Sequence, residues 1–398
     1  MNMSRREFVS ALAAGSLAVA APGLAFAAPG RGQQRLVLVI LRGGLDGIAA
    51  VAPHGDPHYE SARRGLALEP PGGAEGPRGL DGFFALHPAL EALHTHYQRG
   101  EVAVVHAVAS PYRARSHFDA QNVLELGLDA PHTARQGWIN RALPLLGPGA
   151  ERAEDYAMAI GQSVPLVLRG PERVTSWAPS KLPGPDEDLM GRLSALYGAD
   201  AFLGPRLEAA LSAERMAGGR GARTRRGDRF ANLAQVAARL LSEEAGPRIA
   251  VLEAGGWDTH ANQGLLAGSL AQRLGRLDQG LGRLATGMGA AWRHTVVLAV
   301  TEFGRTVAMN GTRGTDHGTA GVALVVGGAV HGGRVLGDWP GLAPAQLHEG
   351  RDLAPVTDIR SLYKGILRDH LGITAADLQS RVFPSSRSAP PMDGLIRL

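Results

Sequence analysis

Short apolar runs that close on a glycine or a polar turn constrain the fold of this chain more than any other feature. The first, RLVLVIL at residues 35–41, is apolar after its first position and leads directly into Arg42-Gly43-Gly44. Continuous apolar runs of this length are typical of β-strands that are buried on both faces. Runs of the same kind lie at residues 101–108, 156–160, 248–254, 295–300 and 322–328.

Segments with helical spacing of their apolar residues separate these runs. We expect helices at residues 87–100, from Ser116 onward, at 229–244, at 265–288, and near the C-terminus with Asp358 in the first turn. Strands that alternate with helices predict an α/β fold with a mostly parallel sheet and helices on both faces. In such sheets ligands bind beyond the carboxyl ends of the strands.

The N-terminus has the features of an export signal. The stretch SRREFV at residues 4–9 resembles the twin-arginine motif, and Ala25-Phe26-Ala27 after an apolar, small-residue stretch resembles a cleavage site. We therefore predict a signal peptide at residues 1–27, the twin-arginine translocase as a transient partner, and a periplasmic or secreted protein. The alternative is an N-terminal membrane anchor, although the apolar stretch is short and broken by glycine and proline. No later stretch is long and apolar enough to predict a stable span in the mature form.

Residues 28–398 are expected to form one α/β domain, with loop excursions near residues 70–81 and 215–229. The second excursion is dense in arginine, and we interpret it as a solvated loop, with contact to an anionic surface as the alternative. No nucleic-acid-binding module is present in the sequence, so no nucleic-acid partner is expected. The chain has no cysteine, which excludes disulfides and thiolate metal sites.

Polar residues cluster at the predicted strand ends, in the turn or loop that follows each run. Because a parallel sheet brings the carboxyl ends of its strands to one edge, we expect these side chains to lie close together. Several carboxylates at one place repel each other unless a cation lies between them, so the pattern predicts a divalent metal. His, Asp and Glu ligands suit zinc, manganese, magnesium or calcium. The candidate residues are Asp46, Ser116, His117, Asp258, His260, Glu302, Arg305, Asp316 and His317.

Each candidate also has a purely structural interpretation. Ser116 and Asp119 fit a capping box in which Asp replaces the usual Glu. Asp258 would cap the helix that follows it, and Glu302 would form an ion pair with Arg305 at the rim of the sheet.

The motifs GGLDG, SHFDAQ, GGWDTHANQ, TEFGRT and GTDHG, in this order, resemble an exported bacterial family labelled only as a domain of unknown function. The resemblance extends from Leu36 to the terminal helix, and the family is distantly similar to the alkaline phosphatase and sulfatase superfamily. The resemblance therefore implies an alkaline-phosphatase-like fold. It also implies metal ligands at Asp46, Asp258, His260 and His317, and a nucleophile at Ser116. Glu302 occupies the strand end that carries an Asp-His pair of ligands in the superfamily, and is therefore also expected to be a ligand.

The chain departs from the superfamily pattern in two places. Asp258 and His260 are closer in sequence than the corresponding ligands, and Phe303 stands after Glu302 where a histidine ligand is expected. One metal, or a weaker second site that uses Asp316, is therefore favoured over two full sites. His117 is an alternative to Ser116 as the functional residue, as a ligand beside a structural serine.

Two functions follow from this pattern. The first is an exported metal-dependent hydrolase of phosphate or sulfate esters, in which Arg305, with Arg113 or Arg115, holds the non-bridging oxygens. The second is a non-catalytic exported binding or assembly protein that keeps the fold and one metal. The expected partner is a small anionic ester or a component of the cell envelope.

Overall fold

Strand β1 (Arg35–Arg42) lies at the centre of the main sheet, between β8 (Ile249–Gly255) and β9 (Thr295–Thr301), and is parallel to both. The computed structural model describes residues 33–73, 76–146, 156–179, 187–198, 229–244 and 246–397, with isolated residues between 200 and 211. The predicted signal peptide and most of the 215–229 excursion lie outside these residues. The 70–81 excursion includes the short strand β3 (Arg78–Gly79).

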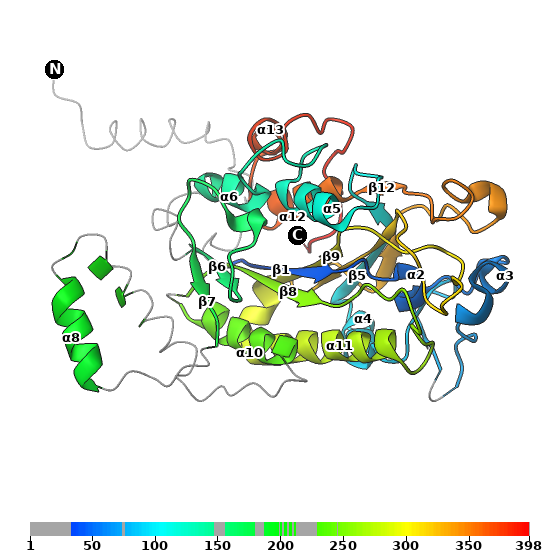
Figure 1. Cartoon of the computed structure of the whole chain (residues 1–398), viewed down its shortest axis with the longest axis horizontal. Helices are drawn as coiled ribbons and strands as arrows, with labels where there is room; N and C mark the ends of the chain where they lie inside the picture. Colours follow the sequence, from blue (N-terminus) through cyan, green and yellow to red (C-terminus); the bar gives the residue numbers. More distant parts are fainter. Residues whose placement is uncertain are drawn as a thin grey trace, which may run out of the picture. The chain divides into compact units, whose positions relative to one another are not determined.

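The main sheet has the order β11-β5-β10-β9-β1-β8-β6-β7, and β12 also pairs with β5. All neighbouring strands are parallel except for the two pairs that β10 forms with β9 and β5. The prediction of an α/β fold with a mostly parallel sheet is therefore confirmed (Figure 1). The remaining strands of this sheet are β5 (Val102–Ala109), β6 (Ala157–Ile160), β7 (Thr175–Trp177), β10 (Gly321–Val326), β11 (Arg334–Leu336) and β12 (Thr357–Asp358).

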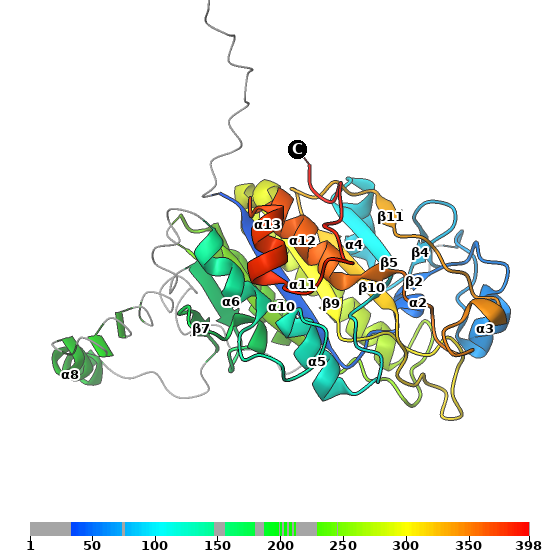
Figure 2. The ribbon, with the colours of Figure 1, turned by 90° about the horizontal axis from the view of Figure 1, so that it is seen from above.

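Helices cover both faces of this sheet (Figures 1 and 2). Because successive side chains of a strand point to opposite faces, Val37 and Val39 of β1 pack in one core while Leu38 and Ile40 pack in the other. The helices of the first face are α4 (Glu91–Gln98), α10 (Arg229–Ser242) and α11 (Ser269–Met288). The second face carries α5 (His117–Leu126), α6 (Trp138–Ala142), α12 (Ile359–Asp369) and α13 (Ala375–Asp377).

Shorter elements complete the fold. A second, three-stranded sheet has the order β2-β4-β3. No helix among the described residues is both long and apolar enough to cross a bilayer. The remaining elements are α2 (Gly47–Ala50), β2 (Val51–Ala52), α3 (Tyr59–Arg63), β4 (Ala85–Leu86) and α8 (Glu187–Gly198).

The helix starts test the sequence predictions most directly. Helix α5 follows Ser116 as predicted, and Asp358 caps α12 by accepting a hydrogen bond from the Arg360 amide. Helix α11 starts at Ser269 and not at residue 265, because Gly268 has a φ of +124°, which no helical residue adopts. The short strands β7, β11 and β12 were not predicted, since two or three residues carry no readable periodicity.

Strand β10 runs opposite to its neighbours, and this direction decides where the chain after β9 goes. A parallel strand would require the chain to cross to the opposite edge of the sheet before it starts. Because β10 is antiparallel to β9, the connection from Glu302 to Ala320 starts and ends at the carboxyl edge. Asp316 and His317 therefore lie at the same edge as Glu302 and Asp258.

Two fully buried histidines should make the fold sensitive to acid. Burial lowers the pKa of His106 and of His370 to about 4, while the unfolded chain titrates near 6.5. His106 Nε2 donates to the Val51 carbonyl, and Nδ1 accepts from the Ala107 amide. A second ring proton would have to bind Nδ1, where it would face the N–H group of Ala107, so the hydrogen bonds favour the neutral ring. Between pH 6.5 and 4 the unfolded state binds more protons, so the free energy of unfolding should fall as the pH falls, by up to about 3 kcal/mol per histidine.

Urea unfolding of the wild type and of His106→Gln between pH 7 and 4.5 measures this effect. The glutamine retains a donor for Val51 but does not titrate, so its stability should decline less steeply with acid. Identical slopes for the two proteins would contradict the prediction.

Candidate metal centre

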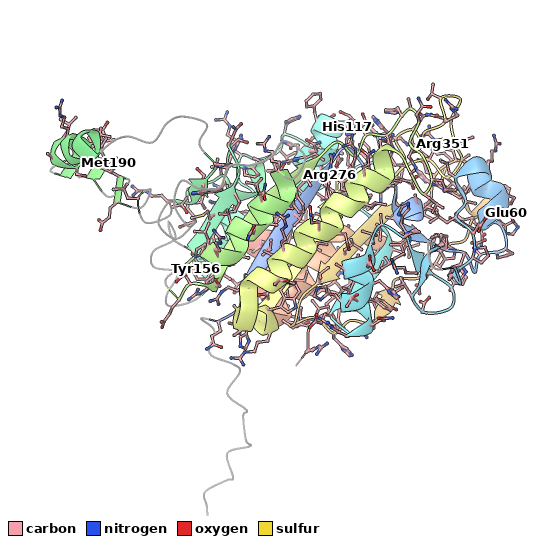
Figure 3. All side chains as sticks on the ribbon, turned by 90° about the horizontal axis from the view of Figure 1, so that it is seen from below. Glu60, His117, Tyr156, Met190, Arg276 and Arg351 are labelled. Atoms are coloured by element: carbon pink, nitrogen blue, oxygen red, sulfur yellow. The ribbon has the colours of Figure 1, made fainter. Side chains whose placement is uncertain are left out.

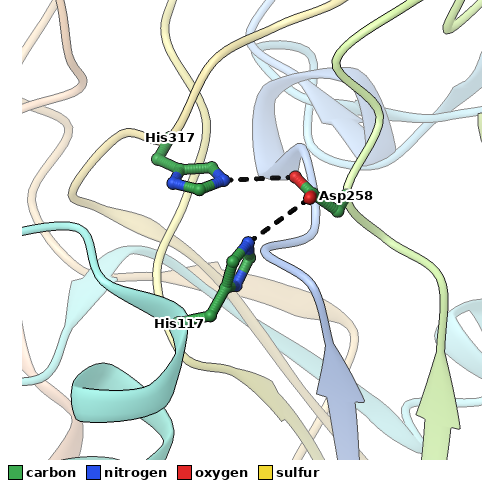
Figure 4. Close-up of side chains that lie close together, drawn as sticks. All are labelled: His117, Asp258 and His317. Carbon is green, nitrogen blue, oxygen red and sulfur yellow. Dashed lines mark hydrogen bonds and ion pairs between the residues drawn. The ribbon is translucent and has the colours of Figure 1, made fainter.

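Three histidines, His117, His260 and His317, surround the carboxylate of Asp258 at the carboxyl edge of the sheet. Figure 3 shows where His117 lies on the ribbon, and Figure 4 shows His117 and His317 beside Asp258. His117 opens α5, Asp258 and His260 follow β8, and His317 precedes β10. The Nε2 atoms of His260 and His317 lie 3.0 and 3.2 Å from Asp258 Oδ1, and His117 Nε2 lies 3.5 Å from Oδ2. The ligand atoms of His117, Asp258 and His317 all lie within 4.8 Å of one another. We call these three residues the metal group.

The Nδ1 atom of each of the three rings forms a hydrogen bond that fixes the orientation of the ring. His117 Nδ1 donates to Glu302 Oε1 at 2.9 Å, and His317 Nδ1 donates to the Arg115 carbonyl at 3.0 Å. His260 Nδ1 donates to Asp316 Oδ1 at 3.0 Å. A carboxylate and a carbonyl only accept, so Nδ1 carries a proton, and in the neutral ring, the form that binds a metal, the Nε2 lone pair is then directed toward Asp258. Histidine ligands of metals are oriented in this way.

The unsatisfied atoms in this cluster fit a bound cation. His117 Nε2 is buried and has no hydrogen-bond partner among the described residues. The Nε2 atoms of His260 and His317 lie only 3.0 Å apart, so without a shared proton two lone pairs would face each other. A cation among these nitrogens and the Asp258 carboxylate would satisfy all of them. Imidazole nitrogens with one carboxylate form a donor set that zinc and similar transition metals prefer over magnesium or calcium.

Arg305 keeps Asp258 ionised. Its side chain is fully buried, and its Nη1 donates to Asp258 Oδ1 at 2.7 Å, while Nε and Nη2 bond Thr315. Burial alone would raise the pKa of Asp258, but the hydrogen bond and charge of Arg305, with smaller contributions from His260 and His117, outweigh it, so this pKa lies below its ordinary value. Arg305 therefore positions Asp258. The predicted role for Arg305, holding substrate oxygens, would require it to leave these partners.

Glu302 lies behind His117 and not in the metal group. Besides His117, its carboxylate accepts from the Gly43 amide at 2.8 Å, from Gln121 at 3.0 Å and from Thr301 at 3.0 Å. Burial would raise the pKa of Glu302, but these hydrogen bonds, led by that of His117, lower it. The same hydrogen bond is the largest cause that raises the pKa of His117. Glu302, predicted as a ligand, thus orients one.

The ring of Phe303 packs against the rings of His117 and His317. Its ring centroid lies 4.8 Å from that of His117 and 4.9 Å from that of His317. It also packs on Gly44, where a Cβ would lie 2.8 Å from the ring and where φ is +74°. An aromatic ring at this place supplies no ligand, which agrees with the preference for one metal over two.

The structure places Asp46 in a buried ion pair outside the metal group. Its carboxylate lies 2.8 Å from Arg63 Nη2, and it accepts hydrogen bonds from Gln263 and from the Ala49 amide as the N-cap of α2. Burial would raise the pKa of Asp46, but the charge and hydrogen bond of Arg63, together with the hydrogen bonds from Gln263 and the Ala49 amide, lower it by more. Asp46, a predicted ligand, is therefore already neutralised by an arginine.

Ser116, Arg113 and Arg115 do not form the contacts predicted for them. Ser116 occupies the N-cap position of α5, but its side chain makes no capping bond, and Asp119 accepts from Tyr112 at 3.0 Å. The capping-box alternative is therefore wrong. Arg113 bonds the carbonyls of Ser110 and Tyr112, and Arg115 pairs with Asp352 and Glu349.

Sequence reasoning missed three residues that support the site: Gln121, Gln263 and Arg63. Gln121 and Gln263 lie inside the motifs SHFDAQ and GGWDTHANQ, so the motifs themselves were the available signal. Gln263 accepts from Thr315 at 2.8 Å and donates to Asp46 at 2.8 Å, and thereby links the Arg63–Asp46 pair to Arg305. Nothing in the sequence near Arg63 marks it as the partner of Asp46.

Comparison with known proteins identifies the family. Over residues 106–383 the sequence matches the family described as a protein of unknown function, DUF1501. The chain belongs to this family, which confirms the membership predicted from the motifs. No match was found among curated proteins.

Three solved structures to which the chain is similar are hydrolases. One is the phosphonate monoester hydrolase of Agrobacterium radiobacter, with 12% identity, a TM-score of 0.43, and coverage of 86% of this chain and 74% of that one. The second is the PsFucS1 sulfatase of a Pseudoalteromonas species, with 14% identity, a TM-score of 0.38, and coverage of 92% and 74%. The third is a cold-active alkaline phosphatase of a psychrophilic Shewanella species, with 16% identity, a TM-score of 0.30, and coverage of 69% and 70%. These similarities are low, so the function proposed below depends on the site geometry of this chain.

Replacing Glu302 by glutamine should weaken metal binding without removing a ligand. The glutamine side chain would have an NH₂ group in place of one carboxylate oxygen, and this group cannot accept a hydrogen bond from the donors around Glu302. His117 would therefore lose its fixed orientation. Loss of such a supporting contact typically weakens metal affinity by about 10–100-fold. Chelator competition with zinc measures this, with the exposed Glu244→Gln as the control. Equal affinity of Glu302→Gln and wild type would contradict the orienting role.

Proposed function

We propose that this chain is a divalent-metal-dependent hydrolase of phosphate or sulfate esters, with zinc as the metal that the site fits best. One observation carries the proposal: three histidines with fixed Nδ1–H groups direct their Nε2 atoms toward one ionised carboxylate. His117, Asp258 and His317 would hold the metal, and His260 lies close enough to join them.

The metal group is open to solvent, as catalytic sites are and structural sites are not. The side chains of His117 and His317 are 24% exposed and that of Asp258 is 41% exposed. Phe118, the residue after His117, is 84% exposed and is available for contact with an apolar part of a substrate.

A bound metal would polarise an ester oxygen and lower the pKa of a hydroxyl or a water molecule beside it. Ser116 directly precedes His117 at the start of α5, where backbone N–H groups and the helix dipole favour an anion. Ser116 is therefore the candidate nucleophile, and a water molecule is the alternative.

A second function, metal-dependent binding without catalysis, is favoured by the arginines. Arg113, Arg115 and Arg305 were the predicted partners of the non-bridging oxygens, and all three have partners within the protein. A catalytic site for phosphate or sulfate esters ordinarily offers such a cation to the developing charge. The binding protein would keep the metal group and turn over no ester.

The cellular setting is part of this proposal. The SRREFV motif supports export by the twin-arginine pathway to the periplasm or beyond, with the translocase as a transient partner. An anionic ester or a component of the cell envelope would be the ligand there.

Metal analysis followed by an ester screen tests the function. Protein purified without chelator should contain about one equivalent of metal, as expected for a single set of ligands. It should hydrolyse p-nitrophenyl phosphate, bis-p-nitrophenyl phosphate or p-nitrophenyl sulfate, lose this activity on chelation and regain it with zinc. Activity that survives in Ser116→Ala would assign the nucleophile to water. Bound metal without turnover of any ester would favour the binding protein, and absence of metal would refute both.

A further inference from the structure

A cleft lies at the carboxyl end of β8, where Gly255 and Trp257, just before Asp258, form part of its lining. This cleft has a volume of about 360 Å³, within the range of small-molecule sites. The ends of β1, β6 and β8, the start of α10 and the first half of α11 enclose it. Its apolar lining is formed by Ile160, Phe230, Leu233, Trp257 and Leu277.

Arginines form the polar part of the cleft. Arg42, Arg229, Arg273 and Arg276 line it together with one acidic residue, Glu253. Arg42 pairs with Glu253 and with Glu125, so its charge is compensated. None of the ion pairs among the described residues joins one of the other three arginines to a carboxylate. Arg276 is exposed on the first half of α11 (Figure 3).

Arg273 is the central residue of this set. Its guanidinium lies against the backbone of Gly256, where a Cβ would be 2.7 Å from Nη1 and where φ is +92°. Its Nε is buried without a hydrogen-bond partner among the described residues. Burial and the charge of Arg276 lower the pKa of Arg273, as expected for a cation that lacks a counter-charge. A buried donor without a partner is rare in native proteins and indicates a missing water, ion or ligand.

We propose that this cleft binds a small organic anion with an apolar body, whose carboxylate, sulfate or phosphate group pairs with Arg273 and Arg276. The planar fork of an arginine matches these oxyanions, and the apolar lining matches the body. The N-terminal end of α10 adds positive potential at the same place, because Arg229, its first residue, lines the cleft. The site is independent of the metal group and does not require that the chain is a hydrolase.

Two fluorescent probes of the same shape test the charge requirement. 8-Anilinonaphthalene-1-sulfonate carries a sulfonate, and 1-N-phenylnaphthylamine has the same apolar body without it. The sulfonate should bind at one site, and Arg273→Gln should weaken it by about tenfold or more, the effect expected for a lost charge-assisted hydrogen bond. Arg276→Gln should weaken it less, and the uncharged probe should bind both variants and wild type equally.

Control variants separate this site from general effects. Arg283 lies on the same helix but outside the cleft. The variant Arg283→Gln should therefore change the sulfonate affinity by no more than about twofold. Asp258→Asn/His317→Gln should bind the sulfonate like wild type, because it alters only the metal group. Unchanged affinity in both Arg273→Gln and Arg276→Gln, or an equal loss in Arg283→Gln, would overturn the proposal.

Discussion

Replacing Asp258 by asparagine and His317 by glutamine in one protein should abolish metal binding, because only His117 of the metal group would remain unchanged. At a thousandfold excess of zinc over its Kd, the free energy of unfolding of the wild type should rise by about 4 kcal/mol. The variant should gain nothing. Urea unfolding with and without zinc, beside metal analysis of both purified proteins, measures the two effects.

These substitutions are chosen so that the fold survives. The Arg305 side chain is fully buried and donates to Asp258, so alanine at position 258 would leave a buried guanidinium without this acceptor. Asparagine keeps an oxygen for Arg305, and glutamine at position 317 keeps a donor for the Arg115 carbonyl. His331→Gln, an exposed histidine outside the metal group, is the matched control. A folded variant that still contains about one equivalent of metal would place the metal elsewhere.

The prediction of the sheet from the sequence succeeded because the strands are buried on both faces. Val37 and Leu38 pack on opposite faces, and both positions must be apolar, so the run is continuous and easy to read. Short edge strands such as β7 and β11 have no such pattern. The direction of β10 was also not readable, since its apolar run is the same whichever way it pairs.

The gathering of candidates at one edge could be predicted, but the division of roles among them could not. The strand ends indicated that Asp258, Glu302 and His317 would lie near one another, and they do. A carboxylate can face the metal, or it can accept from the Nδ1 atom of a histidine ligand. The choice depends on side-chain rotamers, which the position of a strand end does not specify. Glu302 is surrounded by donors and Asp258 by histidines and Arg305, so only the structure assigns the supporting and the ligating carboxylate.

Asp46 gives the largest expected effect on folding. It and Arg63 form an ion pair in which both side chains are almost completely buried, at 1% and 0% exposure. Removal of one partner leaves the other charged and uncompensated, which typically costs about 3–5 kcal/mol. Asp46→Asn and Arg63→Met should each lower the free energy of unfolding by about this amount in urea titrations.

The same variants decide between the two roles of Asp46. As a metal ligand, Asp46 would be required for metal binding and Arg63 would not. As the structural partner of Arg63, which the structure shows, neither is required, and both variants should bind one equivalent at saturating zinc while folded. The double variant Asp46→Leu/Arg63→Met should cost less than the sum of the single changes, because no unpaired charge remains. Loss of metal in Asp46→Asn alone would restore Asp46 to the ligand set and would show that the ion pair opens when the metal binds.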